Sequence, residues 1–152
     1  MPVIDGCLSV LFTSPASSTF LARELETVFD IGRMREAFNP NPMQGFAPAE
    51  IVSRRKGTWF SFKAGAPGLI AAELCGLFDT YLEKTAFILV LRRDIVAQAV
   101  CLQKTEHARQ WHSTQRPQQG AIYDGARIAR SIENIAKGGD RLREYIKRAR
   151  RP

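Results

Sequence analysis

The sequence predicts an α/β fold of three layers, in which a central, mainly parallel sheet is covered by helices on both faces. Three runs of strand length, residues 10–12, 58–63 and 86–91, are separated by segments whose apolar residues recur at helical spacing. Strands that alternate with helices pair in parallel through right-handed crossovers. The chain has 152 residues, of which 45% are hydrophobic, so we expect a single domain that spans residues 1–152.

The first strand leads into a turn rich in hydroxyl groups. Residues 10–12 are typical of a strand buried on both faces, and Ser17, Ser18 and Thr19 follow after a short turn. A helix is expected next, so its first N–H groups, its positive dipole end and the hydroxyls would meet in one small volume that suits phosphate or sulfate. The same residues also suit ordinary N-cap chemistry, and the turn lacks the Gly-Lys-Ser/Thr ending of a Walker A loop.

A long loop and a second strand come next. Residues 30–48 are rich in Gly, Pro, Asn and Met, and a long irregular loop beside an anion-binding turn is usually functional or disordered. In residues 58–63 two phenylalanines alternate with Ser61 and Lys63. This alternation predicts a strand with one aromatic face and one polar face.

The sequence pattern of the second half of the chain predicts a buried strand with one helix before it and one helix after it. Pro67 starts a helix that leads to residues 86–91, a continuous apolar run that we expect to be the central strand. Another helix is expected after Asp94. The inward-facing residues are Ile70, Leu74, Leu77, Phe78 and Tyr81 in the first helix and Ile95, Val96, Ala99, Val100 and Leu102 in the second.

Two arginines, Arg92 and Arg93, directly follow the expected central strand. Open α/β sheets bind ligands at the carboxyl ends of their strands, so this pair suits a second anion site. The alternative is a pair of solvated charges in a turn, with Asp94 as the helix cap. The sequence leaves both interpretations open.

The last helical region carries most of the positive charge. It is expected to begin near Tyr123 and to be interrupted at Gly138 and Gly139. The net charge of the chain is +7, and residues 127–151 hold nine basic and three acidic residues. A basic segment can attract nucleic acid, but no known nucleic-acid-binding motif accompanies it. A solvated helical face is the simpler explanation, and we expect no nucleic-acid partner.

The three cysteines, Cys7, Cys75 and Cys101, are far apart and odd in number. They predict reduced thiols in a cytoplasmic protein. Without close Cys or His pairs, no metal site is expected. No targeting segment or membrane-spanning run is apparent in the sequence.

The order of motifs resembles the bacterial sulfotransferase family typified by trehalose 2-sulfotransferase, whose members use the donor 3'-phosphoadenosine 5'-phosphosulfate (PAPS). The resemblance covers residues 11–145. Its strongest part is an Arg-Arg-Asp followed by a Gln-Ala-Val, a Trp and a Tyr-Asp, which stand here at residues 92–94, 98–100, 111 and 123–124. The resemblance implies a P-loop-like sulfotransferase architecture and transfer of a sulfuryl group to a hydroxyl of a carbohydrate or glycolipid.

The resemblance also implies which residues bind the donor. Residues 14–19 are similar to the family's loop for the 5'-phosphosulfate. Arg93, with Arg92 as a near-equal candidate, and Cys101 match the spacing of the family's 3'-phosphate arginine and serine. The implied donor-binding residues are Ser14, Pro15, Ala16, Ser17, Ser18, Thr19, Arg92, Arg93 and Cys101.

The catalytic and acceptor-binding residues come from two further segments. Residues 32–40 resemble the family's Gly-x-Pro-x-Glu-x-Phe segment, whose glutamate acts as the base, so Glu36 is the implied base. Lys63 ends a Phe-Ser-Phe-Lys strand that resembles the family's Phe-Gly-x-Lys, and it is the second implied catalytic residue. The implied acceptor contacts are Arg33, Phe38 and Trp111, although Trp111 also suits a core or lid aromatic.

The chain departs from the family pattern in four positions. Ser18 stands where the family has a glycine, and Phe20 where it has a threonine. Ala16 stands where the family has a loop arginine, and Cys101 stands where it has a serine, which is a better hydrogen-bond donor than a thiol. The chain also stops at Pro152, before the family's C-terminal part, so we expect a shortened or diverged member. The alternative function is a catalytically impaired module that binds an anionic nucleotide or a protein partner. Otherwise the expected partners are the small-molecule donor and acceptor, with a homodimer as one option.

Overall fold

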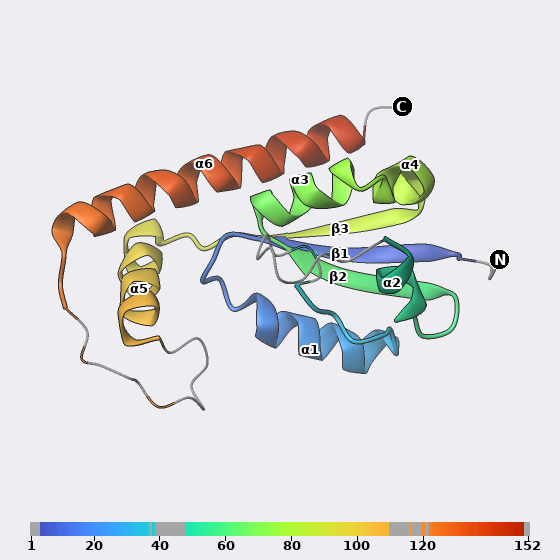
Figure 1. Cartoon of the computed structure of the whole chain (residues 1–152), viewed down its shortest axis with the longest axis horizontal. Helices are drawn as coiled ribbons and strands as arrows, with labels where there is room; N and C mark the ends of the chain where they lie inside the picture. Colours follow the sequence, from blue (N-terminus) through green and yellow to red (C-terminus); the bar gives the residue numbers. More distant parts are fainter. Residues whose placement is uncertain are drawn as a thin grey trace.

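The sheet of the protein consists of parallel strands that are joined by crossover connections containing helices. The computed structural model describes residues 4–36, 38, 48–109, 116, 120 and 122–150. In this part of the chain the strands are ordered β2-β1-β3 (Figure 1). The strands are β1 (Gly6–Phe12), β2 (Trp59–Ala64) and β3 (Thr85–Val90), and the helices are α1 (Ser18–Phe29), α2 (Pro48–Ser53), α3 (Ala66–Leu74), α4 (Leu77–Tyr81), a 3₁₀ turn (Leu82–Lys84), α5 (Ile95–Ala108) and α6 (Gly125–Ala149).

The register brings the carboxyl ends of the three strands to one edge of the sheet. Leu11 of β1 lies beside Ala64 of β2, and Phe12 lies beside Val90 of β3. The segments that follow β1 and β3 therefore leave the sheet side by side. This is the edge at which open α/β sheets bind ligands.

The predicted place of β3 in the sheet was wrong. Among the described strands β1 is central and β3 lies at the edge, where its residues are only partly buried. In β1, by contrast, Cys7, Ser9, Val10 and Leu11 are fully buried. A continuous apolar run indicates burial, but it does not state how many neighbours a strand has.

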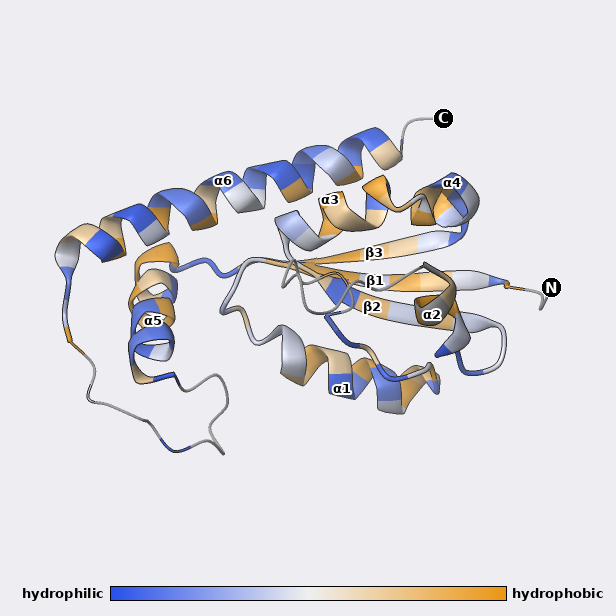
Figure 2. Ribbon diagram, in the orientation of Figure 1, coloured by the Kyte–Doolittle hydropathy of each residue, from blue (hydrophilic) through white to orange (hydrophobic). Residues whose placement is uncertain are grey.

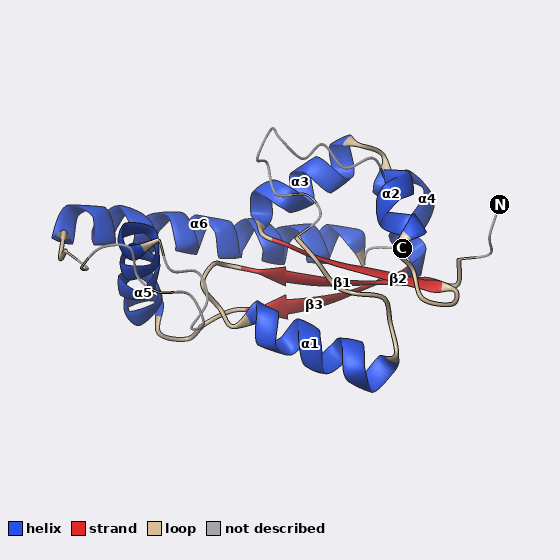
Figure 3. Cartoon of the chain, turned by 60° about the horizontal axis from the view of Figure 1, so that its bottom comes forward, coloured by secondary structure: helices blue, strands red, loops and turns tan. Residues whose placement is uncertain are grey.

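The sheet is covered on both faces, which confirms the three-layer α/β prediction. On one face α1 packs on Val10 of β1, together with Ile31 and Met34 from the following segment. On the other face α3, α4 and α6 enclose a cluster of aromatic rings (Figure 3). Figure 2 shows hydrophobic residues along the strands and alternating hydrophobic and hydrophilic residues along α6. The rings of the cluster are Phe38, Phe60, Phe62, Phe78, Phe87, Tyr81 and Tyr145.

The single helix expected after Pro67 is two helices. Gly76 has a φ of 78°, in the left-handed region that favours glycine, and it separates α3 from α4. Two residues of α3 that were predicted to face the core instead face outward, since Ile70 and Leu74 are 46% and 83% exposed. Their places in the core are taken by residues one or two positions away, Leu69 and Ala72.

The interruption expected at Gly138 and Gly139 does not occur, because α6 is continuous from Gly125 to Ala149. Here the helix passes the ends of β1 and β3, and a Cβ at Gly139 would lie 3.6 Å from Leu91 and 3.8 Å from Thr13. Packing on the sheet therefore outweighs the low helix propensity of two glycines, roughly 1 kcal/mol each relative to alanine.

Helix α5 stands beyond the carboxyl ends of the strands and packs on the first half of α6 (Figures 1 and 3). Ala99 of α5 and Ile128 and Ile135 of α6 form the core of this contact. Val96, predicted to face inward, is 55% exposed. Asp94 and Asp124 cap the two helices, since each carboxylate accepts a hydrogen bond from the N–H three residues later.

The positive charge of α6 lies on its solvated face. Each of its three acidic residues pairs with a basic residue three or four positions later. Such exposed pairs add at most a few tenths of a kcal/mol each. Their arrangement is that of a solvated helical face, the simpler of the two explanations for the basic segment. The pairs are Glu133–Lys137, Asp140–Arg143 and Glu144–Lys147.

Candidate active site

The hydroxyl-rich turn after β1 leaves N–H groups at the start of α1 without a side-chain cap. Ser17, the N-cap residue, has a φ of 59° and its hydroxyl caps nothing. Its carbonyl accepts from the N–H groups of Phe20 and Leu21, whereas no hydrogen bond in the described part of the chain uses those of Ser18 and Thr19. The turn therefore does not follow the ordinary N-cap chemistry that the sequence left as an alternative. Its free donors suit an anion.

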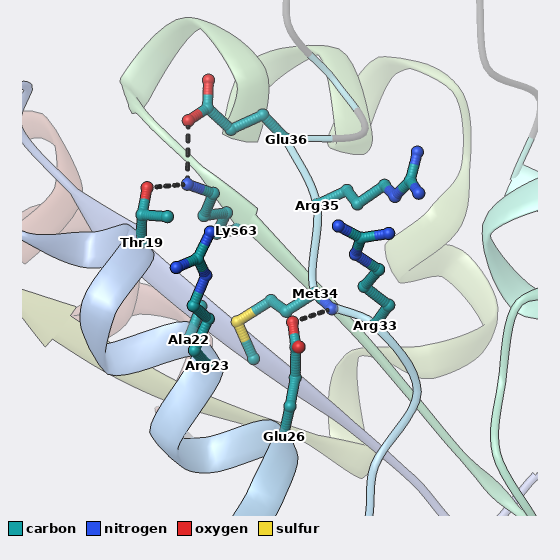
Figure 4. Close-up of a pocket in the computed structure, with 9 residues that line it drawn as sticks. All are labelled: Thr19, Ala22, Arg23, Glu26, Arg33, Met34, Arg35, Glu36 and Lys63. Atoms are coloured by element: carbon teal, nitrogen blue, oxygen red, sulfur yellow. Dashed lines mark hydrogen bonds and ion pairs between the residues drawn. The ribbon is translucent and has the colours of Figure 1, made fainter. Parts of the chain in front are cut away.

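Lys63 connects this turn to Glu36 (Figure 4). Its ammonium donates to Thr19 Oγ1 at 2.7 Å and lies 3.1 Å from Glu36 Oε1. It also lies 5.6 Å from the centre of the Phe12 ring. The residue is only 7% exposed, and a buried ammonium costs several kcal/mol unless it is paired. These contacts hold the cation at one place between the turn and the carboxylate.

Residues 31–36 are held along β2 and α1 by buried polar contacts. Ser61 Oγ donates to the Gly32 carbonyl at 2.7 Å, and the Lys63 N–H donates to the Arg35 carbonyl at 2.9 Å. On the other side the Met34 N–H donates to Glu26 Oε1 at 2.6 Å. Strand β2 thus presents its polar face to this segment, as the alternation in its sequence predicted. The contacts place Glu36 next to Lys63.

Gly32 allows the segment to lie this close to its neighbours. A Cβ at this position would lie 2.4 Å from the backbone oxygen of Arg54 and 3.2 Å from the backbone nitrogen of Lys56. Backbone atoms cannot move away as the end of a side chain can. The glycine is therefore required by close approach of two backbones.

A pocket of about 330 Å³ opens beside Lys63 and Glu36, between α1 and residues 33–36 (Figure 4). It is lined by Thr19, Ala22, Arg23, Glu26, Arg33, Met34, Arg35, Glu36 and Lys63. Four of these side chains are cationic and two are anionic. The pocket is thus a positively charged hollow with a carboxylate beside it.

The second predicted anion site lies at the same edge of the sheet. Arg92 and Arg93 are exposed and follow β3, directly beside the turn that follows β1. The helix cap that the solvated-turn alternative expected is present, because Asp94 caps α5 and accepts from the Ala97 N–H at 2.8 Å. No ion pair in the described part of the chain engages either arginine.

Gln98 ties α5 to the end of β1. Its side chain is 1% exposed, and Nε2 donates to the Thr13 carbonyl at 2.8 Å and to Thr13 Oγ1 at 3.0 Å. Cys101 lies about one turn further along α5 and is half-buried. Buried hydrogen bonds thus join the turn after β1 to the helix that follows the arginine pair. The sequence analysis did not assign Gln98, although its place in the Gln-Ala-Val motif was a usable signal.

The remaining predicted site residues lie in three different settings. Arg33 lines the pocket, whereas Phe38 is 6% exposed and packs edge-on against Phe62, with 5.3 Å between ring centres. Trp111 lies outside the described residues. Ala16 is in the turn, half-buried.

Five further pocket residues were not predicted: the charged Arg23, Glu26 and Arg35, and the apolar Ala22 and Met34. Arg23 stands four positions after Thr19 in α1, and that spacing places both on one face of a helix. Arg35 stands two positions after Arg33. The spacing was therefore a signal for both arginines once the helix and segment had been assigned.

Two kinds of feature are absent from the described ranges. No group of three or more His, Cys, Asp or Glu residues there is placed to hold a metal ion. None of the helices there is both long enough and apolar enough to cross a membrane.

The comparisons with known proteins fit this arrangement. The family described as Stf0 sulphotransferase matches residues 64–150, which is more than half of the chain. The match includes Arg92, Arg93 and Cys101 and begins one residue after Lys63. No curated protein matches the sequence. The length of the family match and the parallel α/β fold together place the protein: it belongs to the Stf0 sulphotransferase family.

Proposed function

We propose that the protein is a sulfotransferase that moves a sulfuryl group from PAPS to a hydroxyl of a carbohydrate or glycolipid. The observation that carries the proposal is the position of Lys63, which contacts Thr19 of the turn and Glu36 at once. A cation between an anion-binding turn and a carboxylate is what sulfuryl transfer requires. Its charge stabilises the leaving phosphate, and the carboxylate takes the proton of the attacking hydroxyl.

The donor lies along the edge where β1 and β3 end. The free N–H groups of the turn, with the hydroxyls of residues 17–19, hold its 5'-phosphate. Arg93 or Arg92 holds its 3'-phosphate, with Cys101 nearby. Support for this comes from the register of β1 and β3, which brings both segments to one edge. Gln98 fixes them relative to each other.

Glu36 acts as the base of the reaction. It removes the proton of the acceptor hydroxyl while the hydroxyl oxygen bonds to sulfur and the bond from sulfur to the 5'-phosphate oxygen breaks. The electron pair of that bond stays on the phosphate. Lys63 neutralises the charge that develops there, a contribution that in comparable sites is worth about 10²–10³ in rate.

The alternative function is a module that binds the nucleotide without turnover. The observation in its favour is Ala16. This residue stands in the turn where the family has an arginine. Lys63 supplies a cation from β2 to the same turn, which favours an active enzyme over an inert module.

A transfer assay with labelled PAPS and a panel of sugars separates the two functions. We expect Glu36→Gln to reduce transfer at least 100-fold while the product nucleotide, 3'-phosphoadenosine 5'-phosphate (PAP), binds as it does to the unaltered protein. Ala16→Arg should raise the rate of an active enzyme. PAP binding without transfer by any of these proteins would establish the rival, and no PAP binding at all would exclude both.

A further inference from the structure

The pocket beside Glu36 contains more positive charge than donor binding and catalysis use. Of its four cations, Lys63 is paired with Glu36. Glu26, the other acid, accepts from the backbone N–H of Met34. Arg23, Arg33 and Arg35 remain, and no ion pair in the described part of the chain engages any of them.

The three arginines line the pocket from two sides. Arg33 and Arg35 are two positions apart on the segment that ends with Glu36, with the buried Met34 between them. Figure 4 shows their guanidinium groups close to each other, with Arg23 reaching up from α1 across the pocket. Both sides are fixed, since Glu26 of α1 is bonded to the backbone of the segment. The backbone that carries Arg33 and Arg35 is therefore fixed relative to α1, while the three arginine side chains are exposed and accessible to a ligand.

This arrangement has a cost that an anionic ligand would remove. Like charges around one hollow repel each other, and water screens them less in a pocket than on an open surface. A guanidinium presents a planar fork of donors that matches the oxygens of carboxylate, sulfate or phosphate. The three arginines are thus better explained as a binding site for a specific anion than as charges that only keep the protein soluble.

The position of the pocket identifies the ligand as the acceptor. Its wall includes Glu36, the proposed base, and Lys63, so a molecule in the pocket places its hydroxyl at the reacting groups. The volume of about 330 Å³ is at the lower end for ligand sites and fits about one sugar ring. A ring held here lies within reach of both the base and the arginines.

We propose that the acceptor carries an anionic group, a carboxylate, sulfate or phosphate ester, in addition to the hydroxyl that is sulfated. Arg33 and Arg35, with Arg23 opposite, bind this group and so select charged sugars over neutral ones. The inference rests on the proposed function, because it takes Glu36 as the base.

Binding in a dead-end complex tests the inference without turnover. The full chain is saturated with PAP and titrated calorimetrically with methyl glucoside, methyl glucuronide and methyl glucoside 6-sulfate, which share one ring and differ at carbon 6. We expect at least one charged sugar to bind 10-fold or more tightly than the neutral one. The carboxylate and sulfate arms distinguish the two sources of the charge.

Two variants test whether the pocket is the source of the preference for charged sugars over neutral ones. In Arg33→Gln/Arg35→Gln the preference should fall to 3-fold or less, whereas Arg130→Gln, an exposed arginine on α6, should retain it. PAP affinity should be the same in all three proteins. Equal binding of charged and neutral sugars, or a preference that survives the double substitution, would overturn the inference.

The outcomes also separate this inference from the proposed function. Normal PAP affinity without a preference for charged sugars refutes the inference and leaves the sulfotransferase proposal standing. A loss of PAP affinity in Arg33→Gln/Arg35→Gln would assign these arginines to the donor and also refute the inference. Failure of the unaltered protein to bind PAP would refute the proposed function.

Discussion

At the scale of single residues, Lys63 determines most of the site. The structure gives its ammonium a hydroxyl, a carboxylate and an aromatic face within a buried environment. The sequence placed Lys63 on the polar face of a strand but did not state which groups it meets. The hydroxyl, the carboxylate and the aromatic ring come from positions 44, 27 and 51 residues earlier in the chain. Local sequence patterns carry no information across such separations.

Replacing Lys63 with methionine tests its catalytic role. We expect transfer to fall about 10²–10³-fold, because the developing charge loses its cation. Stability should change little, since methionine keeps the apolar stem and Glu36 is exposed enough to be hydrated. Steady-state transfer rates and urea unfolding measure the two effects. Unchanged transfer by a folded Lys63→Met protein would contradict the assigned role.

Because the thiol of Cys7 is buried, we expect the folded protein to lose stability at alkaline pH. Burial in β1 raises the pKa of its thiol to about 12, opposed by a weaker hydrogen bond with Thr85. The unfolded chain ionises near pH 9, so the contribution of the neutral thiol is complete below that pH and is lost between about 9 and 12. Its loss amounts to roughly 1.4 kcal/mol per pH unit within this range.

The matched comparison is Cys7→Ala, which titrates identically at every other group. Its free energy of unfolding in urea should differ from that of the unaltered protein by a constant amount up to pH 8.5. Between pH 9 and 10.5 the difference should shrink at about the rate given above. A difference that stays constant over this range would show that Cys7 ionises at its ordinary pKa.

At the scale of elements, tertiary contacts corrected several sequence predictions. The apolar stripe after Pro67 predicted one continuous helix, but the chain changes direction at Gly76. An interruption was predicted at Gly138 and Gly139, but α6 is continuous there. The difference lies in conformation, because Gly76 has positive φ and the two glycines of α6 remain helical. Composition alone cannot distinguish these cases. The strands were easier to predict, because short apolar or alternating runs indicate a strand whatever its burial. Ser61 and Lys63 on the polar face of β2 are in fact buried, like its phenylalanines.

Gly138→Ala should stabilise the protein by about 0.5–1 kcal/mol. The added methyl lowers the conformational entropy of the unfolded chain and would meet only Thr13, at 3.8 Å. Urea unfolding measures the effect, with Gly76→Ala as the control. That control should be destabilised, because alanine at a φ of 78° is strained. Destabilisation by Gly138→Ala would mean that α6 needs glycine to pack against β1.

At the scale of the whole molecule, the sequence predicted the parts of the site better than their connection. It predicted the turn and the arginine pair from the strands that they follow, and Glu36 from the resemblance to the family. It did not assign Arg23 and Arg35 to the pocket, because Arg23 lies on a helix and Arg35 on a loop that only the fold brings together. Nor did it reveal how Gln98 links α5 to β1, a contact between residues 85 positions apart. Parallel pairing of β1 and β3 is what joins these parts.

The most direct test of the account compares PAP with adenosine 5'-monophosphate, which lacks the 3'-phosphate, by calorimetric titration of the unaltered protein and of Arg93→Ala. If the turn after β1 and the arginines after β3 hold opposite ends of one nucleotide, PAP should bind 10-fold or more tightly than the monophosphate. That advantage should fall to near unity in Arg93→Ala, or in Arg92→Ala if Arg92 is the arginine that binds. Equal affinities for the two nucleotides, or tighter binding of PAP that neither substitution alters, would contradict the claim that these two segments bind opposite ends of one nucleotide.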